Sequence, residues 1–308
     1  MKQLIERIRA IVDSENVLVD EPMSAHTTFR VGGPADCFVM PRTIDELVKV
    51  LDLVRTSGQA LFVMGRGSNL LVSDEGLRGV VVQIANNLSD VQIDASGLVK
   101  AEAGASNARI ASMARDAGLT GYEFAAGIPG AVGGAAIMNA GAYDGEFKQV
   151  AVGATCVDGE GRLVNVTPEQ AEWGYRSSAI ARNGLIVASV ELQLHPGDPD
   201  DIQERMDDLA CRRQDKQPLD KPSAGSTFKR PEGHFAGKLI QDAGMQGYQV
   251  GGAQVSTKHA GFVVNVGGAT AADVLTVIHD VQRAVSREFG IDLEPEVRLW
   301  GFSENVQR

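Results

Sequence analysis

Apolar residues recur at helical spacing in five parts of the chain, and this pattern predicts five main helices. The clearest start signal is the pair Thr43 and Glu46, which has the spacing of a capping box, and Gly58 marks the end of the same helix. The predicted helices cover residues 1–12, 43–58, 106–117, 202–216 and 270–290.

Shorter apolar and β-branched runs between turn residues predict strands. A turn signal at residues 158–161 joins two of these runs into a hairpin. The last run is expected to form one continuous strand, so that Glu296 and Arg298 would lie on the same face. The predicted strands cover residues 36–40, 60–64, 79–84, 91–93, 98–103, 150–157, 162–166, 184–194 and 293–302. Loops and strands of a second lobe are expected at residues 217–231, 244–252 and 261–266. This mixture of strands and helices indicates an α+β fold.

The length of 308 residues suggests two domains, and the best linker candidate is the segment of Pro, Gly and Asp at residues 195–201. The net charge of −11 argues against nucleic acid or an anionic membrane as the main partner. Three widely spaced cysteines, with no CxxC pair, are typical of reduced thiols. The first residues lack the apolar core of a signal peptide, and no apolar run is long enough to span a membrane. We therefore expect a soluble cytoplasmic protein.

A glycine- and alanine-rich stretch dominates the middle of the chain. Twelve of the eighteen residues from Ala125 to Ala142 are Gly or Ala, and none is charged. Backbone N–H groups in such a segment can approach an anion closely, and the run after Pro129 can begin a short helix whose N-terminus favours negative charge. Residues 65–72, GRGSNLLV, add a second candidate turn for an anion, although Leu70 replaces the third glycine of a Rossmann motif. Both stretches fit a large ligand that carries phosphates.

Other candidate chemistry is weaker. Ser226 follows a glycine in a polar loop, but the sequence has no nucleophile elbow, which argues against a hydrolase triad. Residues 233–238 nearly match a phosphate-binding loop but are one residue short. The histidines have no metal-ligand spacing, and we expect no metal site. Arg176 beside Tyr175 could hold a carboxylate or phosphate through two hydrogen bonds, although such pairs more often serve an interface. Glu296 could equally belong to a solvated strand end.

Six motifs occur in a fixed order between residues 26 and 301, and together they resemble one family. They read TTFRVGGPA, GRGSNLLV, AAGIPGAVGGAAIMNAGAY, GYRSS, PSAGSTFKRP and LEPEVRLWG. This set closely resembles the UDP-N-acetylenolpyruvoylglucosamine reductases, also called UDP-N-acetylmuramate dehydrogenases. The spacing between Arg176 and Ser226 leaves no room for an inserted tyrosine-bearing flap, which resembles the shorter of the family's two types.

The resemblance implies an FAD-binding fold of the vanillyl-alcohol-oxidase (PCMH) type with a separate α+β substrate-binding domain. The expected FAD-binding domain covers residues 1–199, with subdomains at about 1–58 and 59–199. The substrate-binding domain would cover 200–295, and a C-terminal strand within 296–308 would return to the FAD-binding domain. The implied activity is the NADPH-driven reduction of UDP-N-acetylenolpyruvoylglucosamine to UDP-N-acetylmuramate, a step of peptidoglycan precursor synthesis, with non-covalent FAD. We expect a monomer, although the sequence leaves the oligomeric state open.

The resemblance also implies site residues. The positions that match the family's catalytic residues are Arg176, Ser226 and Glu296. Arg176 and a protonated Glu296 would stabilise charge that develops on the substrate carboxylate, and Ser226 would protonate the α-carbon as general acid. The implied cofactor-binding residues are Gly65, Arg66, Gly67, Ser68, Asn69, Ala126, Gly127, Ile128, Pro129, Gly130, Gly133, Gly134, Asn139, Gly141 and Ala142. The implied substrate-binding residues are Tyr175, Arg230, Lys238, His259 and Asn265; some relatives have Asn in place of Arg230.

Two other functions remain open at this point. A flavin oxidase of the same fold would use O₂ and a sugar or alcohol, and His26 would be its candidate covalent anchor for the flavin. A flavin- or nucleotide-sugar-binding sensor would bind without turnover, but the presence of Arg176, Ser226 and Glu296 argues against it. Release of free yellow FAD on acid precipitation would favour the reductase over a covalently tethered oxidase.

Overall fold

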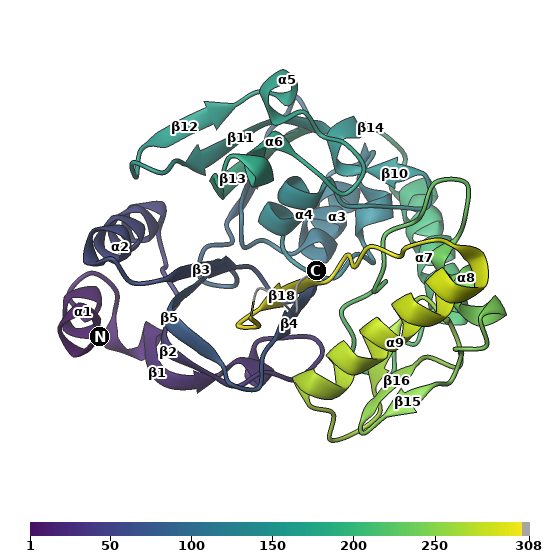
Figure 1. The fold of residues 1–308 in the computed structure, drawn as a ribbon. Helices are drawn as coiled ribbons and strands as arrows, with labels where there is room; N and C mark the ends of the chain where they lie inside the picture. The colour runs from purple at the N-terminus through teal and green to yellow at the C-terminus, as the bar shows by residue number, and fades with distance from the viewer. Residues whose placement is uncertain (304–308) are drawn as a thin grey trace. The chain divides into compact units, whose positions relative to one another are not determined.

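The chain forms two compact units in the computed structural model, which describes residues 1–303 (Figure 1). The first unit comprises residues 1–19, 37–66 and 79–213. The second comprises residues 20–36, 67–78 and the chain from residue 214 onwards. Strands β1 (Val17–Pro22), β2 (Pro34–Val39) and β5 (Leu77–Gln83) each cross from one unit to the other. Each unit is thus assembled from segments that are distant in sequence.

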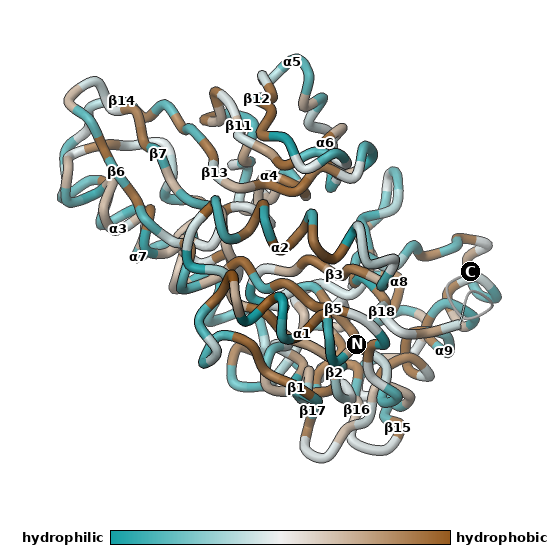
Figure 2. The backbone as a smooth tube through the Cα atoms, turned by 90° about the vertical axis from the view of Figure 1, so that its left-hand side faces the viewer, coloured by the Kyte–Doolittle hydropathy of each residue, from teal (hydrophilic) through white to brown (hydrophobic). Residues whose placement is uncertain are grey.

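A four-stranded sheet has the order β1-β2-β5-β3. Its strand β3 (Leu61–Met64) pairs in parallel with β5, with Leu61 opposite Val80. Helix α2 (Ile44–Ser57) contacts β3. In Figure 2, hydrophobic and hydrophilic residues alternate along α2, whereas β3 and β5 are mainly hydrophobic. The apolar side of the helix therefore joins the core of the first unit, which includes buried Leu47 and Val80.

A five-stranded antiparallel sheet, of order β12-β11-β13-β7-β6, forms the other main part of the first unit. The predicted hairpin is confirmed, since β11 (Ala151–Val157) pairs with β12 (Leu163–Val166) across the expected turn. Helix α4 (Val132–Met138), which lies within the glycine-rich stretch, contacts β13 (Ile186–Gln193). The short helix predicted there is also confirmed.

The ends of α2 follow the expected signals, with one correction. The Thr43 hydroxyl accepts a hydrogen bond from the Glu46 N–H at 3.1 Å, and Gly58 ends the helix in the left-handed region at φ +70°. The Glu46 carboxylate accepts from the N–H of Arg42 at 2.7 Å, and the box predicted with Thr43 is therefore only half formed. The Arg42 N–H competes for the same carboxylate.

The other elements of the first unit are short or cover its edges. The helices are α1 (Lys2–Arg9), α3 (Asn107–Asp116), α5 (Pro168–Ala171), α6 (Ala179–Arg182) and α7 (Pro199–Lys216), whose last residues enter the second unit. Single 3₁₀ turns occur at Ser14–Asn16, Glu123–Ala125 and Phe147–Gln149. The strands are β6 (Val91–Ile93), β7 (Leu98–Glu102), β8 (Leu119–Thr120), β9 (Gly141–Ala142), β10 (Gly145–Glu146) and β14 (His195–Pro196).

The second unit is built around helix α9 (Ala271–Phe289), which packs on the three-stranded sheet β15-β16-β17. The helix begins at a full capping box between Thr270 and Asp273 and ends at Gly290, as predicted. Asp74, from far earlier in the chain, accepts hydrogen bonds from the N–H groups of Ala271 and Ala272. This carboxylate therefore stabilises the positive end of the helix dipole.

The remaining elements of the second unit include three that the sequence did not predict, namely β4, α8 and β16. Helix α8 lies in the segment that nearly matched a phosphate loop, and β16 lies between two glycine-rich turns. The bounds are a 3₁₀ turn at Met23–Ala25, β4 (Leu70–Val72), α8 (Ala236–Asp242), β15 (Gln249–Val250), β16 (Ala253–Val255), β17 (Val263–Asn265) and β18 (Arg298–Trp300).

Three further expectations need correction. The predicted strand 293–302 is regular only at β18, which pairs in parallel with β4, and Glu296 lies outside it. The expected sharing of one strand face by Glu296 and Arg298 is therefore wrong. Residues 195–196 of the predicted linker form β14, which pairs with β8, and α7 already begins at Pro199, a residue suited to a first helical turn. Residues 304–308 of the predicted C-terminal strand lie outside the described residues.

Cys37, Cys156 and Cys211 are reduced, and the first two are buried. Within residues 1–303, the helices are either too short or too polar to cross a bilayer.

Candidate active site

The turn after β3 begins the first expected cofactor loop, and the first unit holds it in place. The side-chain amide of Gln83 donates to the carbonyl of Gly65 at 3.2 Å, and Arg66 Nη2 donates to Asn86 Oδ1 at 2.6 Å. The Nε of Arg66 is buried and has no hydrogen-bond partner among the described residues. A buried donor of this kind suits an oxygen of a bound ligand.

The same loop continues into the second unit at Gly67, Ser68 and Asn69. Gly67 adopts φ +64°, and a Cβ there would lie 2.0 Å from the carbonyl oxygen of His26. Only glycine can therefore occupy this position. The His26 ring lies 2.8 Å from a carboxylate oxygen of Glu21. His26 was considered above as a covalent anchor for the flavin, and this contact occupies its Nε2 atom.

The second expected loop, from Ala126 to Gly134, includes Ile128, Pro129 and Gly130 and leads into α4. The N–H of Val132 donates to the carbonyl of Ala105 at 2.8 Å, and the N–H of Gly133 donates to Ala103 at 2.9 Å. These two donors at the helix start are therefore used by the chain itself. An anion at the start of α4 would therefore have to be bound by other donors of this loop.

Gly134 provides a direct test of whether the loop fits a bound cofactor. It lies within α4 and is exposed, and no described atom comes within 4 Å of the position that a Cβ would take. Glycine inside a helix costs about 0.5–1 kcal/mol relative to alanine. The packing of the chain itself leaves room for a side chain at this position, so it does not explain the glycine. Close approach of a flat ligand to the helix would explain it. The site therefore fits FAD at this position.

The end of α4 is fixed by Asn139, which is 2% exposed and left-handed at φ +43°. Its side-chain Nδ2 donates to Glu146 at 2.7 Å and to the carbonyl of Gly174 at 3.1 Å. Its Oδ1 accepts from the N–H of Lys148 at 2.9 Å. Asn139 therefore connects the end of α4 to the segments around residues 146–148 and to Gly174. Next to it, Gly141 and Ala142 form β9, which pairs with β10.

Arg176 lies in the first unit, directly after Gly174 and Tyr175. Its Nη2 donates to the carbonyl of Gly141 at 3.3 Å, and its guanidinium lies 5.6 Å from the centre of the Tyr175 ring. Tyr175 is 59% exposed. Arg176 is therefore held against the glycine-rich segment, while the tyrosine is available to a ligand.

Left-handed backbone is concentrated in this part of the chain. Of seven described non-glycine residues with positive φ, five lie between residues 139 and 176. Such conformations cost of order 1–3 kcal/mol each and are typically found at functional sites. The five residues are Asn139, Tyr143, Asp144, Glu172 and Arg176.

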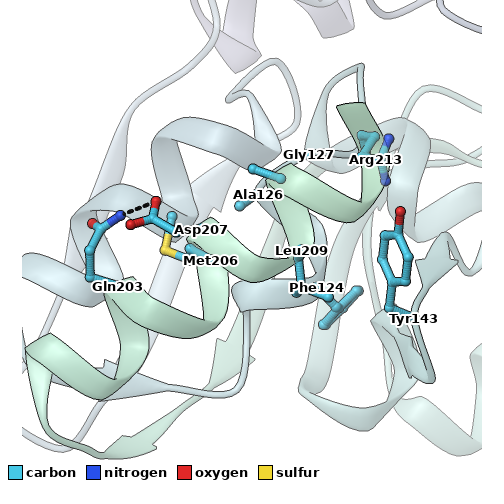
Figure 3. Close-up of a pocket in the computed structure, with 10 residues that line it drawn as sticks. Phe124, Ala126, Gly127, Tyr143, Gln203, Met206, Asp207, Leu209 and Arg213 are labelled. Atoms are coloured by element: carbon cyan, nitrogen blue, oxygen red, sulfur yellow. Dashed lines mark hydrogen bonds between the residues drawn. The ribbon is translucent and has the colours of Figure 1, made fainter. Parts of the chain in front are cut away.

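A pocket of about 160 Å³ lies beside the second loop, between it and α7 (Figure 3). Arg213 lines this pocket with Tyr143, and its guanidinium lies 6.0 Å from the centre of the tyrosine ring. The Arg213 side chain lies directly on Gly127, where a Cβ would be 2.8 Å from its Nε. Among residues 1–303, Arg213 has no carboxylate partner, whereas its neighbour Arg212 pairs with Asp208.

Burial of the Arg213 guanidinium lowers its pKa below the usual value. A half-buried guanidinium without a carboxylate partner is suited to a bound anion. Sequence reasoning missed this residue, and its only signal was an Arg pair at the end of a charged helix.

Ser226 and Glu296 lie together in the second unit. Thr227, next to Ser226, accepts at its carbonyl a hydrogen bond of 2.8 Å from the N–H of Glu296. Phe228 and Pro295 form an isolated bridge in the same place. Ser226 is exposed and Glu296 is half-buried, whereas Thr227 is fully buried. The structure thus brings two of the three expected catalytic residues to one place, while Arg176 belongs to the other unit.

The expected substrate-binding residues Arg230 and Lys238 are exposed cations of the second unit. The Nε of Arg230 donates to the carbonyl of His234 at 3.2 Å, and its guanidinium lies 4.0 Å from the centre of the Phe235 ring. Phe235 is itself 63% exposed. Lys238 pairs with Asp242 one turn further along α8. Both cations remain accessible to a diphosphate.

His259 and Asn265, also in the second unit, are more strongly engaged. His259 Nδ1 accepts from the N–H of Gly261 at 3.1 Å, and burial lowers the pKa of the ring. The neutral ring therefore carries its proton on Nε2. Asn265 donates to the carbonyl of Phe29 at 3.0 Å and accepts from the N–H of Gly267 at 2.9 Å. Its amide thus supports the turn after β17.

Two regions of the chain match models of known families. Residues 35–167 match an FAD binding domain, and residues 217–300 match the C-terminal domain of UDP-N-acetylenolpyruvoylglucosamine reductase. The chain is 49% identical over 296 residues to a UDP-N-acetylenolpyruvoylglucosamine reductase of Agathobacter rectalis, covering 92% of this chain and 94% of that one. It is 48% identical over 304 residues to the reductase of Clostridium botulinum, covering 99% of each chain. The chain belongs to the UDP-N-acetylenolpyruvoylglucosamine reductase family.

Solved structures agree with this assignment. The crystal structure of UDP-N-acetylenolpyruvylglucosamine reductase from Thermus caldophilus matches with a TM-score of 0.78 and 36% identity, covering 92% of this chain and 98% of that one. Alkyldihydroxyacetonephosphate synthase matches with a TM-score of 0.51 and 14% identity, over 64% of this chain and 40% of that one, which shows a likeness of fold alone. These findings confirm the resemblance, the fold class and FAD as the cofactor.

Proposed function

We propose that this chain reduces the enolpyruvyl ether of UDP-N-acetylenolpyruvoylglucosamine to the lactyl ether of UDP-N-acetylmuramate, in peptidoglycan precursor synthesis. The observation that carries this proposal is 48% identity to a reductase of that name over 99% of both chains. FAD, held by the loops at residues 65–69 and 126–134, would supply hydride transfer from NADPH to the β-carbon of the enolpyruvyl group. The chain's own residues bind the cofactor, stabilise charge and move the proton.

Arg176 stabilises the charge that develops on the substrate carboxylate. As the β-carbon gains hydride, the π electrons of the double bond move toward the α-carbon and its carboxylate. The permanently charged, planar guanidinium can bind both carboxylate oxygens. The hydrogen bond to the Gly141 carbonyl holds the Arg176 side chain in place, so that the side chain needs to move little when the negative charge develops.

Ser226 protonates the α-carbon. Its hydroxyl is exposed, so a substrate can reach it, and the backbone next to it is fixed through buried Thr227. A serine hydroxyl is a weak acid, but the carbon that it meets is strongly basic at this stage. The serine oxygen then recovers a proton from solvent, and the lactyl product is complete.

Glu296, as a neutral carboxylic acid, donates a hydrogen bond to the substrate carboxylate and thereby stabilises the same developing charge. Tyr175, Arg230, Lys238 and His259 are proposed to bind the substrate, with the two cations suited to its diphosphate. The neutral His259 ring would donate through Nε2. We propose that residues 200–295 chiefly bind the substrate and that residues 1–199 chiefly bind FAD. The described residues from 296 onwards belong to the same compact unit as residues 214–295.

We further place the enzyme in the cytoplasm, because its NADPH and UDP-sugar are cytosolic nucleotides. We also propose that it is a monomer. Size-exclusion chromatography with light scattering tests the second statement, and a dimer at micromolar concentration would contradict it.

Anaerobic stopped-flow absorbance tests the proposed reaction directly. The yellow holoenzyme should bleach with NADPH and regain its colour when the UDP-sugar is added. A flavin that is reoxidised only by O₂ would favour the oxidase, and a flavin that never bleaches would favour the sensor. Acid precipitation should release all of the FAD into the supernatant.

A further inference from the structure

The peptide groups at Glu296 are held from both sides within the second unit. The N–H of Glu296 donates to the carbonyl of Thr227 at 2.8 Å. The carbonyl of Glu296 accepts a hydrogen bond from the side-chain amide of Asn69 at 3.0 Å. In turn, the backbone carbonyl of Asn69 accepts from the N–H of Arg298 at 3.0 Å. Asn69 therefore contacts the chain on both sides of Val297.

This arrangement matters because Glu296 lies outside regular structure. It follows Pro295 and precedes β18, so no strand partner supplies a continuous ladder of hydrogen bonds at this position. Asn69 directly precedes β4. Strand β4 pairs with β18, and the first pair of this ladder is Leu70 and Arg298. A side-chain amide on a fixed strand end thus completes the hydrogen bonding of the irregular residue.

We propose that Asn69 is a positioning residue for Glu296, an inference that rests on the role given to Glu296 above. Its amide Nδ2 donates to the carbonyl of Glu296, and the residue also ends the loop expected to hold FAD. The same short segment, Gly67 to Asn69, therefore links the cofactor loop to the catalytic carboxylic acid. Glu296 must be positioned accurately, because its carboxyl group has to donate a hydrogen bond to the substrate carboxylate on which charge develops.

The expected effect is on one half-reaction more than on the other. A displacement of about 1 Å at a catalytic group can cost roughly 10²-fold in rate. Removal of the amide donor should therefore slow reoxidation of the reduced flavin by the UDP-sugar by about 10- to 100-fold. Reduction of the flavin by NADPH does not use Glu296 and should slow far less.

Two variants and one control make the test. Asn69→Asp keeps the shape of the side chain but replaces the donor with a carboxylate oxygen, and Asn69→Ala removes the group altogether. The control is Gln282→Ala, because the Gln282 amide donates to the carbonyl of Leu293 at 2.8 Å in the same segment. Both half-reactions are timed by flavin absorbance without oxygen. Selective slowing of reoxidation in both Asn69 variants, with Gln282→Ala near normal, is the expected result.

A double-mutant cycle with Glu296→Ala separates positioning from general damage, because alanine, unlike glutamine, removes the hydrogen-bond donor. If Asn69 acts through Glu296, Asn69→Ala should have little further effect once Glu296→Ala is present. An equal rate loss from Asn69→Ala with and without Glu296→Ala, or equal slowing by Gln282→Ala, would overturn the inference while leaving the proposed function intact. Normal reoxidation in Glu296→Ala alone would instead overturn the role proposed for Glu296 itself.

Discussion

The hydroxyl oxygen of Thr227 accepts a hydrogen bond from the backbone N–H of Val263 at 3.0 Å, and Thr227 is completely buried. The Thr227 N–H also donates to the carbonyl of Gly261, and its own carbonyl accepts from Glu296. This residue therefore fixes the backbone between Ser226 and Phe228. Its side chain is a structural support directly beside the proposed acid.

Thr227→Val should destabilise the protein, because it leaves the buried Val263 N–H without its acceptor. The expected loss is about 1–3 kcal/mol in the free energy of unfolding. Thr227→Ser, which keeps the hydroxyl, should lose less. Urea unfolding of the apoprotein measures both variants, and an unchanged Thr227→Val would show that the hydroxyl contributes nothing to stability.

Ser226→Ala should leave flavin reduction by NADPH near its normal rate and slow reoxidation by the UDP-sugar severely. General acid catalysis typically contributes ~10² to 10⁴-fold, and this range sets the expected size of the loss. Ser226→Cys retains a transferable proton and should recover part of the rate. Normal reoxidation in Ser226→Ala would mean that another group donates the proton, and equal slowing of both half-reactions would indicate a structural defect.

If the half-buried cation of Arg213, which lies on Gly127, binds a phosphate of FAD, Arg213→Gln should weaken FAD binding by roughly tenfold. Arg212→Gln is the matched control, since Arg212 pairs with Asp208 on the exposed side of the same helix. Quenching of FAD fluorescence on titration with apoprotein gives both dissociation constants. Equal affinities in the two variants would exclude a contact between Arg213 and the phosphates.

Cys156 should make stability depend on pH in alkaline solution. Burial raises the pKa of its thiol from 9.0 to about 11. The unfolded chain therefore loses this proton near pH 9 while the folded protein still holds it. The contribution is complete below pH 9 and is lost as the pH rises from 9 to 11, by about 2 kcal/mol. Cys156→Ala should show a correspondingly smaller decrease in urea-unfolding free energy over that range, and parallel pH curves would contradict this assignment.

Much of the fold follows from local signals in the sequence. The predicted helices from Thr43 and Thr270 have their caps, and the hairpin around residues 158–161 has its turn, because these features depend on neighbouring residues. The segment predicted as a strand at residues 293–302 is regular only at residues 298–300, where it pairs with β4. Its partner lies more than two hundred residues earlier, so the sequence of the segment itself could not show which residues would pair. Pairing between distant segments leaves no local pattern.

The site shows the same division. The glycine-rich loops could be identified from composition, and the family's motifs supplied Arg176, Ser226 and Glu296. Composition could not show that neighbouring carbonyls already use N–H groups at the start of α4, or that Asn139 is occupied by structural hydrogen bonds. The support given by Asn69 and Thr227 was equally hidden, because an amide or a hydroxyl has no sequence signature for its distant partner.

The discontinuous makeup of the second unit has a practical consequence for anyone who wishes to study it in isolation. A fragment cut at the limits of the matching C-terminal family region, residues 217–300, would omit Phe29, Val31 and Leu71, all buried in that unit's core. It would also omit Asp74, which caps α9. Such a fragment would expose an apolar gap and an uncapped helix, and should aggregate or remain unfolded. Binding studies and inhibitor screens therefore need the whole chain, or a redesigned polypeptide that carries the two early segments as well.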